Sequence, residues 1–240
     1  MKYLMAIDAG TGSVRAVIFD TKGNQISVGQ REWTHLSVDG VSDSMNFDFV
    51  NNWELTKSCI NEAINKSAIN VSDILAVSSS SMREGIVLYD KNGCEIFAVA
   101  NVDARASKEV KYLNKKYPKL EREFYKHSGQ TFALGAIPRL LWVKNNHPEI
   151  YERTTTISMI SDWVLAKLSG EIAVDPSNAG TSGIFNLKTR QWEKTMATKV
   201  GLKDDIFPPV YESGEVYAEV SKKASAETGL NTDTKIVMGG

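Results

Sequence analysis

The sequence predicts an α/β domain built on a mixed sheet, and two patterns indicate this fold class. Three β-rich runs follow one another at the N-terminus with short turns between them, which is typical of an antiparallel three-strand unit. An amphipathic helical stretch and another buried strand come next, so the pattern changes to strand–helix–strand. A sheet that combines both patterns is mixed, and we expect helices to flank it.

The strands are predicted from short β-rich runs bounded by turn residues. Asn92-Gly93 is a strong hairpin signal, whereas the Ser- and Asp-rich stretch from Trp33 to Phe47 predicts a loop, as does Asp175–Gly183. The expected strands are Tyr3–Ile7, Val14–Asp20, Gln25–Glu32, Ile74–Ser79, Ile86–Tyr89, Glu95–Ala100, Thr154–Ile160, Gly183–Asn186 and Lys235–Met238.

The helices are predicted from apolar residues at helical spacing and from capping residues. Asp48 and Ser161 are the expected N-caps of two of them, and Pro138 opens a third. The expected helices are Phe49–Ser67, Ser107–Lys116, Pro118–Lys126, Pro138–Asn145, the stretch from Ser161 to Gly170, Trp192–Val200 and Ser221–Thr228. No long linker divides these elements, so we expect one continuous domain.

Composition narrows the function classes. Hydrophobic residues make up 42% and charged residues 24% of the 240 residues, as in ordinary globular proteins. A net charge of -1 gives no support for a nucleic-acid partner, and no apolar run reaches membrane-spanning length. Without a signal peptide at the start, the expected location is the cytoplasm. Cys59 and Cys94 form no disulfide framework, and the three histidines show no zinc-ligand or catalytic-triad spacing.

The first turn is a candidate phosphate site. A strand ends in Asp8, and small residues then lead into the next strand. Glycines allow backbone N–H groups to face outward at torsion angles that other residues avoid, hydroxyls add donors, and an arginine adds a fixed cation. The candidate phosphate-binding residues are Gly10, Thr11, Gly12, Ser13 and Arg15. Asp8 is the candidate Mg²⁺ ligand, directly or through water. An ordinary hairpin turn rich in small residues is the alternative.

Two charged pairs follow strands further along the chain. Arg83 and Glu84 come after a buried strand and offer donors and acceptors suited to neighbouring hydroxyls of a polyol. Asp103 and Arg105 repeat the pattern after the second hairpin. If all these strands belong to one sheet, the pairs lie near Asp8 and form a site for a hydroxylated small molecule beside a phosphate. The alternative for each is a surface ion pair.

The motifs together resemble those of the FGGY carbohydrate kinases. Asp8 to Arg15 resembles the family's Asp-x-Gly-Thr-x-Ser-x-Arg signature, and Met82-Arg83-Glu84 is similar to its polyol-binding segment. Asn101 to Arg105 is similar to the Trp-Asn-Asp-x-Arg element, except that Asn101 replaces Trp. Further matches in family order are Ser161–Leu165, Asn178–Gly183 and Phe185-Asn186. The resemblance covers essentially the whole chain.

This resemblance implies an actin-like ATPase fold of the ribonuclease H type, in which two domains close around ATP and sugar. Residues 1–240 would be the N-terminal domain, and the C-terminal nucleotide-binding domain would lie outside this chain. Asp8 would face Mg²⁺–ATP, and Arg83, Glu84 and Asp103 would hold substrate hydroxyls. The catalytic base would be an Asp just after Gly240, so no catalytic residue is expected here. A strand that closes on Gly-Gly also indicates a fragment.

The activity implied for the parent protein is transfer of the ATP γ-phosphoryl group to a hydroxyl of a small sugar or polyol. Ser80–Gly85 and Asn101–Arg105 are most similar to the family members that act on autoinducer-2, a small linear tetrahydroxy-pentanedione signal, whereas glycerol and xylulose kinases share the framework. The 240-residue chain is expected to fold without kinase activity. The alternatives are an actin-like ATP-switch module and a sugar-binding protein without catalysis. The sequence predicts no oligomeric state.

Overall fold

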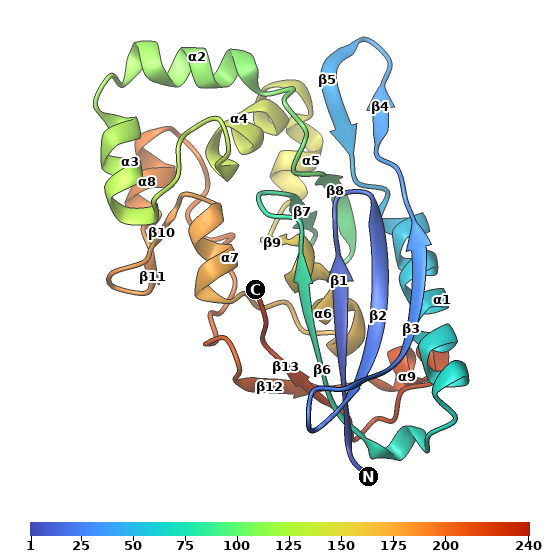
Figure 1. Cartoon of the computed structure of the whole chain (residues 1–240). Helices are drawn as coiled ribbons and strands as arrows, with labels where there is room; N and C mark the ends of the chain where they lie inside the picture. Colours follow the sequence, from blue (N-terminus) through green and yellow to red (C-terminus); the bar gives the residue numbers. More distant parts are fainter.

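Two sheets, of six and five strands, organise the structure (Figure 1). The structure is a computed structural model, and it describes all 240 residues. The larger sheet has the strand order β12-β13-β6-β1-β2-β3. Its strands are β1 (Tyr3–Ala9), β2 (Ser13–Asp20), β3 (Gln25–Glu32), β6 (Ile74–Ser81), β12 (Val216–Glu219) and β13 (Lys235–Val237).

The larger sheet is mixed, as predicted. β1, β2 and β3 pair antiparallel in chain order, whereas β6 lies parallel to β1 on its other side. β13 then pairs parallel to β6. Alternate residues of β1, such as Met5 and Ile7, point into the core, which is the period-two burial of a sheet with one covered face. Because β1 and β6 run in the same direction, their C-terminal ends meet at one edge.

The smaller sheet has the order β4-β5-β8-β7-β9. The predicted second hairpin is β7 (Ile86–Tyr89) and β8 (Glu95–Val99), and every residue of β7 is buried. The remaining strands are β4 (Leu36–Val38), β5 (Val41–Asn46) and β9 (Thr156–Met159). The loop predicted over Trp33–Phe47 is therefore wrong, because it contains the β4–β5 hairpin. A separate two-stranded sheet joins β10 (Phe185–Asn186) to β11 (Gln191–Trp192).

Nine α-helices and one 3-10 helix complete the fold. The helices packed on the larger sheet are α1 (Phe49–Ser67) and α6 (Ile160–Ser169), and α9 (Lys222–Thr228) packs against both of them. The 3-10 helix is Val71–Asp73. The other helices are α2 (Ser107–Lys116), α3 (Leu120–Ser128), α4 (Ala136–Asn146), α5 (Pro148–Arg153), α7 (Pro176–Thr181) and α8 (Lys194–Lys199).

Two helix-start predictions have different outcomes. Asp48 caps α1 as expected, since its side chain accepts a hydrogen bond from the Asn51 N–H. Ser161 is not the cap of α6, which begins at Ile160 after Met159. The Asp162 carboxylate instead accepts the Met159 N–H at 3.1 Å and so stabilises the helix start from inside.

Two other segments differ from their predictions. The predicted loop Asp175–Gly183 contains α7, whose start is capped by the Asp175 side chain through the N–H groups of Ser177 and Asn178. The helix predicted over Trp192–Val200 is shorter, because Trp192 belongs to β11. Short polar helices lack the repeating apolar face from which a sequence pattern is recognised.

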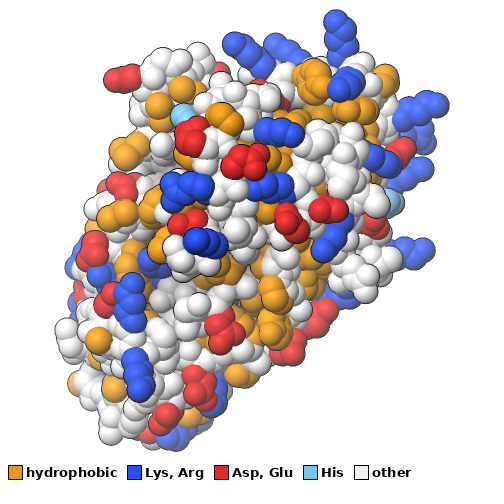
Figure 2. All heavy atoms as spheres, turned by 180° about the vertical axis from the view of Figure 1, so that it is seen from behind, with side chains coloured by type: hydrophobic (Ala, Val, Ile, Leu, Met, Phe, Trp, Pro, Cys, Tyr) orange, Lys and Arg blue, Asp and Glu red, His pale blue; other side chains and the backbone are white.

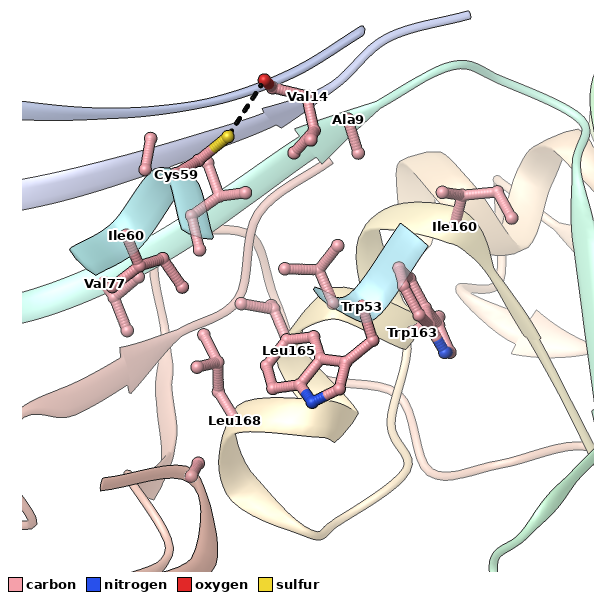
Figure 3. Packing of buried hydrophobic residues seen from close by; sticks show 14 of the residues in the cluster. Ala9, Val14, Trp53, Cys59, Ile60, Val77, Ile160, Trp163, Leu165 and Leu168 are labelled. Atoms are coloured by element: carbon pink, nitrogen blue, oxygen red, sulfur yellow. Dashed lines mark hydrogen bonds between the residues drawn. The ribbon is translucent and has the colours of Figure 1, made fainter. Parts of the chain in front are cut away.

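The main core lies between the two sheets. It contains inward side chains of the larger sheet together with α1 and α6, and Figure 3 shows Trp53 and Trp163 lying close to one another there. Their ring centroids are 6.3 Å apart in an edge-on arrangement. The Cys59 side chain of α1 faces β2, with its Sγ 3.4 Å from the Val14 carbonyl oxygen. A second core packs the other face of the smaller sheet against α2, α3 and α4.

The surface carries both signs of charge. Seen from behind, Lys and Arg side chains are interspersed with Asp and Glu, and blue side chains gather near the top right (Figure 2). This mixing agrees with the formal net charge of -1. None of the helices is sufficiently long and apolar to span a membrane.

Candidate active site

Asp8 and Arg15 face each other across the β1–β2 pair, beside the predicted phosphate turn. Arg15 Nε and Nη2 lie 2.8 and 2.7 Å from Asp8 Oδ2. The Arg15 side chain is 52% exposed and the Asp8 side chain is 42% exposed. Asp8 Oδ1 accepts no hydrogen bond from the protein, so one carboxylate oxygen is available to a ligand.

The turn itself is held from below by Trp33. The Trp33 indole Nε1 donates to the Gly10 carbonyl at 2.9 Å, and the Trp33 N–H donates to the Gly12 carbonyl at 3.1 Å. Thr11 and Gly12 are exposed above it. The torsion argument for the glycines is wrong, because neither adopts a positive φ. A Cβ on Gly12 would meet no atom within 4 Å, so contacts within this chain do not require glycine at that position either.

Arg83 and Glu84 lie directly beside this turn. β6 is in register with β1, so that Ser81 pairs with Ala9, and the Met82 N–H donates to the Ala9 carbonyl at 2.9 Å. The prediction that Arg83 and Glu84 follow a strand adjacent to that of Asp8 is confirmed by this pairing. The two predicted binding segments therefore share one edge of the larger sheet.

The Arg83 and Glu84 side chains form hydrogen bonds with different segments of the chain. Arg83 Nη2 donates to the Ser177 carbonyl at 2.8 Å, at the start of α7. Glu84 Oε1 accepts a hydrogen bond from Gln130 Nε2 at 3.2 Å. Arg83 is exposed and Glu84 is half-buried, which leaves a cation and a carboxylate accessible on adjacent residues. This arrangement can donate to one hydroxyl of a polyol and accept from the next.

Asn101 connects the smaller sheet to the turn that follows β1. It follows β8, and its Nδ2 donates to Thr11 Oγ1 at 3.1 Å. The side chain is half-buried at this junction. Asn101 therefore links the predicted phosphate turn, at the edge of the larger sheet, to the loop that follows β8 of the smaller sheet.

Asp103 differs from its expected placement. It follows β8, which belongs to the smaller sheet, so the assumption that all these strands share one sheet is wrong. The Asp103 side chain has no exposed area, and its Oδ2 accepts hydrogen bonds from Arg105 Nε at 2.7 Å and from the Met45 N–H at 2.6 Å. Arg105 is buried as well, with its guanidinium carbon 4.9 Å from the Trp142 ring centroid. This geometry favours a structural role for the pair, and it does not favour the predicted contact of Asp103 with substrate.

We call the edge formed by the turn beside Asp8, by Arg83 and Glu84, and by Asn101 the rim. The C-terminal glycines lie on this rim. In Figure 1 the chain ends beside α7. A Cβ placed on Gly240 would lie 2.9 Å from Asp175 Oδ2 and would collide with Ser177 Oγ. Arg83 contacts Ser177 as well, so the end of the chain and the Arg83 side chain meet at the start of α7. A larger residue at position 240 would require the Ser177 and Asp175 side chains to move.

The donors present suit a hydrated Mg²⁺ held largely by phosphate. No three His, Cys, Asp or Glu side chains gather in a group that could hold a metal ion. Asp8 offers a single accessible carboxylate, and Mg²⁺ characteristically keeps several waters and binds one or two carboxylates together with substrate phosphates. Asp8 would hold the ion in this way, whereas a metal centre built from protein ligands alone does not fit.

The comparisons with known proteins identify the class of this protein. Residues 3–240 match the N-terminal domain of the FGGY family of carbohydrate kinases, and the chain belongs to that family. Autoinducer-2 kinase from Enterobacter sp. (strain 638) is 56% identical over 241 residues, which cover 100% of this chain and 46% of the relative. The Salmonella typhimurium autoinducer-2 kinase is 54% identical over 239 residues, which cover 99% of this chain and 45% of that relative. The chain thus spans about half the length of these curated relatives.

Solved structures show the same fold at low sequence identity. A ligand-bound xylulose kinase from Lactobacillus acidophilus superimposes with a TM-score of 0.90 at 20% identity, over 100% of this chain and 48% of that chain. Plasmodium falciparum glycerol kinase with ADP superimposes with a TM-score of 0.86 at 18% identity, over 100% of this chain and 48% of that chain. The expected actin-like, ribonuclease H-like fold is confirmed by these neighbours.

Proposed function

We propose that this chain is the N-terminal part of an ATP-dependent carbohydrate kinase, which transfers the ATP γ-phosphoryl group to a hydroxyl of a small sugar or polyol. The observation that carries the proposal is convergence on one rim. The turn beside Asp8 adjoins Arg83 and Glu84, and Asn101 bridges to Thr11 from the second sheet. A phosphate site and a hydroxyl site placed side by side are what phosphoryl transfer to an alcohol requires.

Each part of the rim has a distinct task in this proposal. The turn residues Gly10–Ser13 lie where phosphate oxygens would be bound, and Asp8 would hold Mg²⁺ through its accessible oxygen. Arg15 supports that carboxylate and adds positive charge beside the phosphates. Arg83 and Glu84 orient neighbouring hydroxyls of the acceptor. Magnesium–ATP supplies the phosphoryl group, and the protein contributes mainly positioning and charge stabilisation, since a loose transition state needs little covalent help.

The remaining parts are proposed to lie beyond Gly240. A C-terminal domain would bind the adenine nucleotide, and an Asp following Gly240 would take the proton from the attacking hydroxyl. Gly240 lies beside Ser177, which Arg83 also contacts, so the next residue would enter the rim where the acceptor is held. Closure of the two domains would exclude water and limit hydrolysis of ATP.

The autoinducer-2 signal is the proposed acceptor. The relatives that are 56% and 54% identical are autoinducer-2 kinases, whereas the xylulose and glycerol kinase structures are at most 21% identical. A pentulose or glycerol as acceptor is the alternative within the same framework. A panel of these three acceptors with the full-length protein distinguishes them by kcat/KM.

The proposal is tested by Glu84→Ala in the full-length protein that carries this chain. We expect loss of acceptor-dependent ADP formation while nucleotide binding, measured by calorimetry, is preserved. Glu171→Ala is the matched control, because Glu171 is exposed and its carboxylate bonds no side chain. If Glu84→Ala left acceptor phosphorylation at the wild-type rate, the proposal would be wrong, and ATP turnover indifferent to any polyol would favour an actin-like switch module.

A further inference from the structure

A single buried arginine ties together the loops that form the proposed acceptor site. Arg139 belongs to α4 and is 4% exposed. Its Nη1 donates to the carbonyls of Glu84 and Leu134 at 2.7 and 3.0 Å. Its Nη2 donates to the carbonyls of Asn101 and Asp103 at 3.3 and 3.2 Å. One guanidinium therefore binds backbone oxygens of three segments, and no carboxylate forms an ion pair with it.

The segment that Arg139 holds most closely is strained. Glu84 has φ +66°, and the Gly85 N–H donates to the Arg83 carbonyl at 2.9 Å. A hydrogen bond from residue i+2 to residue i around a positive φ defines the rare form of the γ-turn. A non-glycine residue in this conformation persists only when its surroundings impose it, and such strain gathers at functional sites. The strained residue here carries the carboxylate assigned to the acceptor.

The turn packs tightly against the core at Gly85. A Cβ on Gly85 would lie 2.7 Å from Ile160 Cγ1 and 3.1 Å from the Val99 carbonyl oxygen, so this glycine sits against the core. The Glu84 carbonyl would point into a buried region without a partner if Arg139 were absent, and an unpaired buried carbonyl is costly. Burial of the guanidinium is in turn compensated by four carbonyl acceptors.

We propose that Arg139 is the positioning residue of the acceptor site: it holds Glu84 in the strained turn and fixes that turn relative to the Asn101–Asp103 loop. Arg139 is buried and is assigned no contact with acceptor or phosphate, and it acts through the backbone of Glu84, the residue assigned to the acceptor. The link to acceptor binding rests on the proposed function, whereas the link to the turn is independent of any activity.

Amide hydrogen exchange in the 240-residue chain tests the link to the turn. In Arg139→Met, the Gly85 amide should exchange at least tenfold faster than in the wild type, while amides in the middle of β1 keep their protection. Arg139→Lys keeps a charge that can reach fewer carbonyls, and should lie between the two. Arg122→Met is the matched control, since Arg122 is exposed and forms no ion pair. Unchanged Gly85 exchange in a folded Arg139→Met variant would overturn the proposal.

A double-variant cycle separates support of the strained turn from general stabilisation. Glycine adopts a positive φ without strain, so Glu84→Gly removes the strain that Arg139 is proposed to sustain. In the Glu84→Gly background, Arg139→Met should accelerate Gly85 exchange at least threefold less than in the wild-type background. Equal acceleration in both backgrounds would contradict the assigned role. If Arg139→Met fails to fold, the same comparison is made with Arg139→Lys.

Kinetics of the full-length protein test the link to the acceptor. Arg139→Met should raise KM for the acceptor at least tenfold and leave KM for ATP within twofold, and Arg139→Lys should recover part of the loss. Equal increases in both KM values would overturn this role for Arg139. Absence of kinase activity in the wild-type full-length protein would refute the proposed function, and the Gly85 exchange would still decide whether Arg139 holds the turn.

Discussion

Arg15 contacts one oxygen of Asp8 through two of its nitrogens, at 2.8 and 2.7 Å, and leaves the other oxygen of the carboxylate without a partner in the protein. An exposed pair of this kind contributes little to folding, usually about 0–1 kcal/mol. Its geometry suits a carboxylate that is oriented for a cation. We therefore expect substitution of Asp8 to change stability little and the proposed activity strongly.

Asp8→Asn is expected to change the free energy of unfolding by less than about 1 kcal/mol. In the full-length protein the same change should lower the Mg²⁺-dependent rate about 10²–10³-fold, the usual effect of losing one preorganised charge-stabilising group. Urea unfolding and a steady-state assay at saturating Mg²⁺ measure the two effects. Arg15→Gln is the partner variant, and a larger rate loss there than in Asp8→Asn would contradict the assigned roles.

Trp163→Ala should destabilise the chain by about 3–5 kcal/mol, because a fully buried indole between α6, α1 and the smaller sheet is removed. Trp163→Phe keeps most of the apolar area but loses the hydrogen bond from Trp163 Nε1 to Glu95 Oε1 at 2.9 Å. We expect it to cost about 1–3 kcal/mol. Equilibrium urea unfolding of the 240-residue chain compares the two. A cost for Trp163→Ala no larger than that for Trp163→Phe would show that the site collapses around the missing ring.

Only one of the two cysteines should react in the native chain. Burial raises the pKa of the Cys59 thiol to about 11, so about 0.1% of it is thiolate at pH 8, whereas Cys94 is exposed. Treatment with iodoacetamide at pH 8 should add one carbamidomethyl group, at Cys94, and two groups after denaturation. Peptide mass spectrometry assigns the sites. Rapid modification of Cys59 in the native chain would mean that α1 opens away from β2.

Asp162 should make the chain less stable as the pH rises above the mildly acidic range. Burial, reinforced by the neighbouring Asp175 carboxylate, raises the pKa of Asp162 well above its ordinary value of 3.8. The folded state then binds this proton more tightly than the unfolded state. Its contribution is fully present below about pH 3.8 and is lost as the pH rises through the raised pKa of the folded state.

Asp162→Asn removes that titration, so the loss of stability between pH 5 and pH 8 should be smaller in the variant than in the wild type. Urea midpoints at the two pH values measure the difference. Asp205→Asn serves as the control, because Asp205 is exposed. Parallel pH dependence in the wild type and in Asp162→Asn would show that the carboxyl is ionised in both states.

Much of the larger sheet could be predicted from the sequence, since its strands are apolar runs bounded by recognisable turns and α1 has a regular apolar face. The β4–β5 hairpin could not, because β4 has only three residues, none of them buried, and β5 has a single buried residue, so neither strand shows alternating burial. β4 and β5 pair with each other, and the hairpin joins the sheet through Asn46 of β5, which pairs with Val99 of β8; that tertiary contact is not contained in local periodicity.

The candidate site was predictable where residues follow a strand directly, as Arg83 and Glu84 do. Asp103 could not be placed, because the sequence does not indicate which sheet a hairpin joins. Arg139 and Gln130 were missed, since both contact the site from segments distant in the chain. A lone cation within the apolar run of α4, every residue of which from Ala136 to Val143 is buried, was the available signal.

β7 has a consequence for how the chain loses its structure. Val87 and Tyr89 belong to the core between the sheets, whereas Ile86 and Leu88 belong to the core beneath α4. Because adjacent residues of one strand are shared by both cores, neither core can melt and leave the other intact. We expect a single cooperative unfolding transition, with the tryptophan fluorescence and the helical circular dichroism changing at the same temperature. The part of the rim on the larger sheet and the part on the smaller sheet would then lose their structure together.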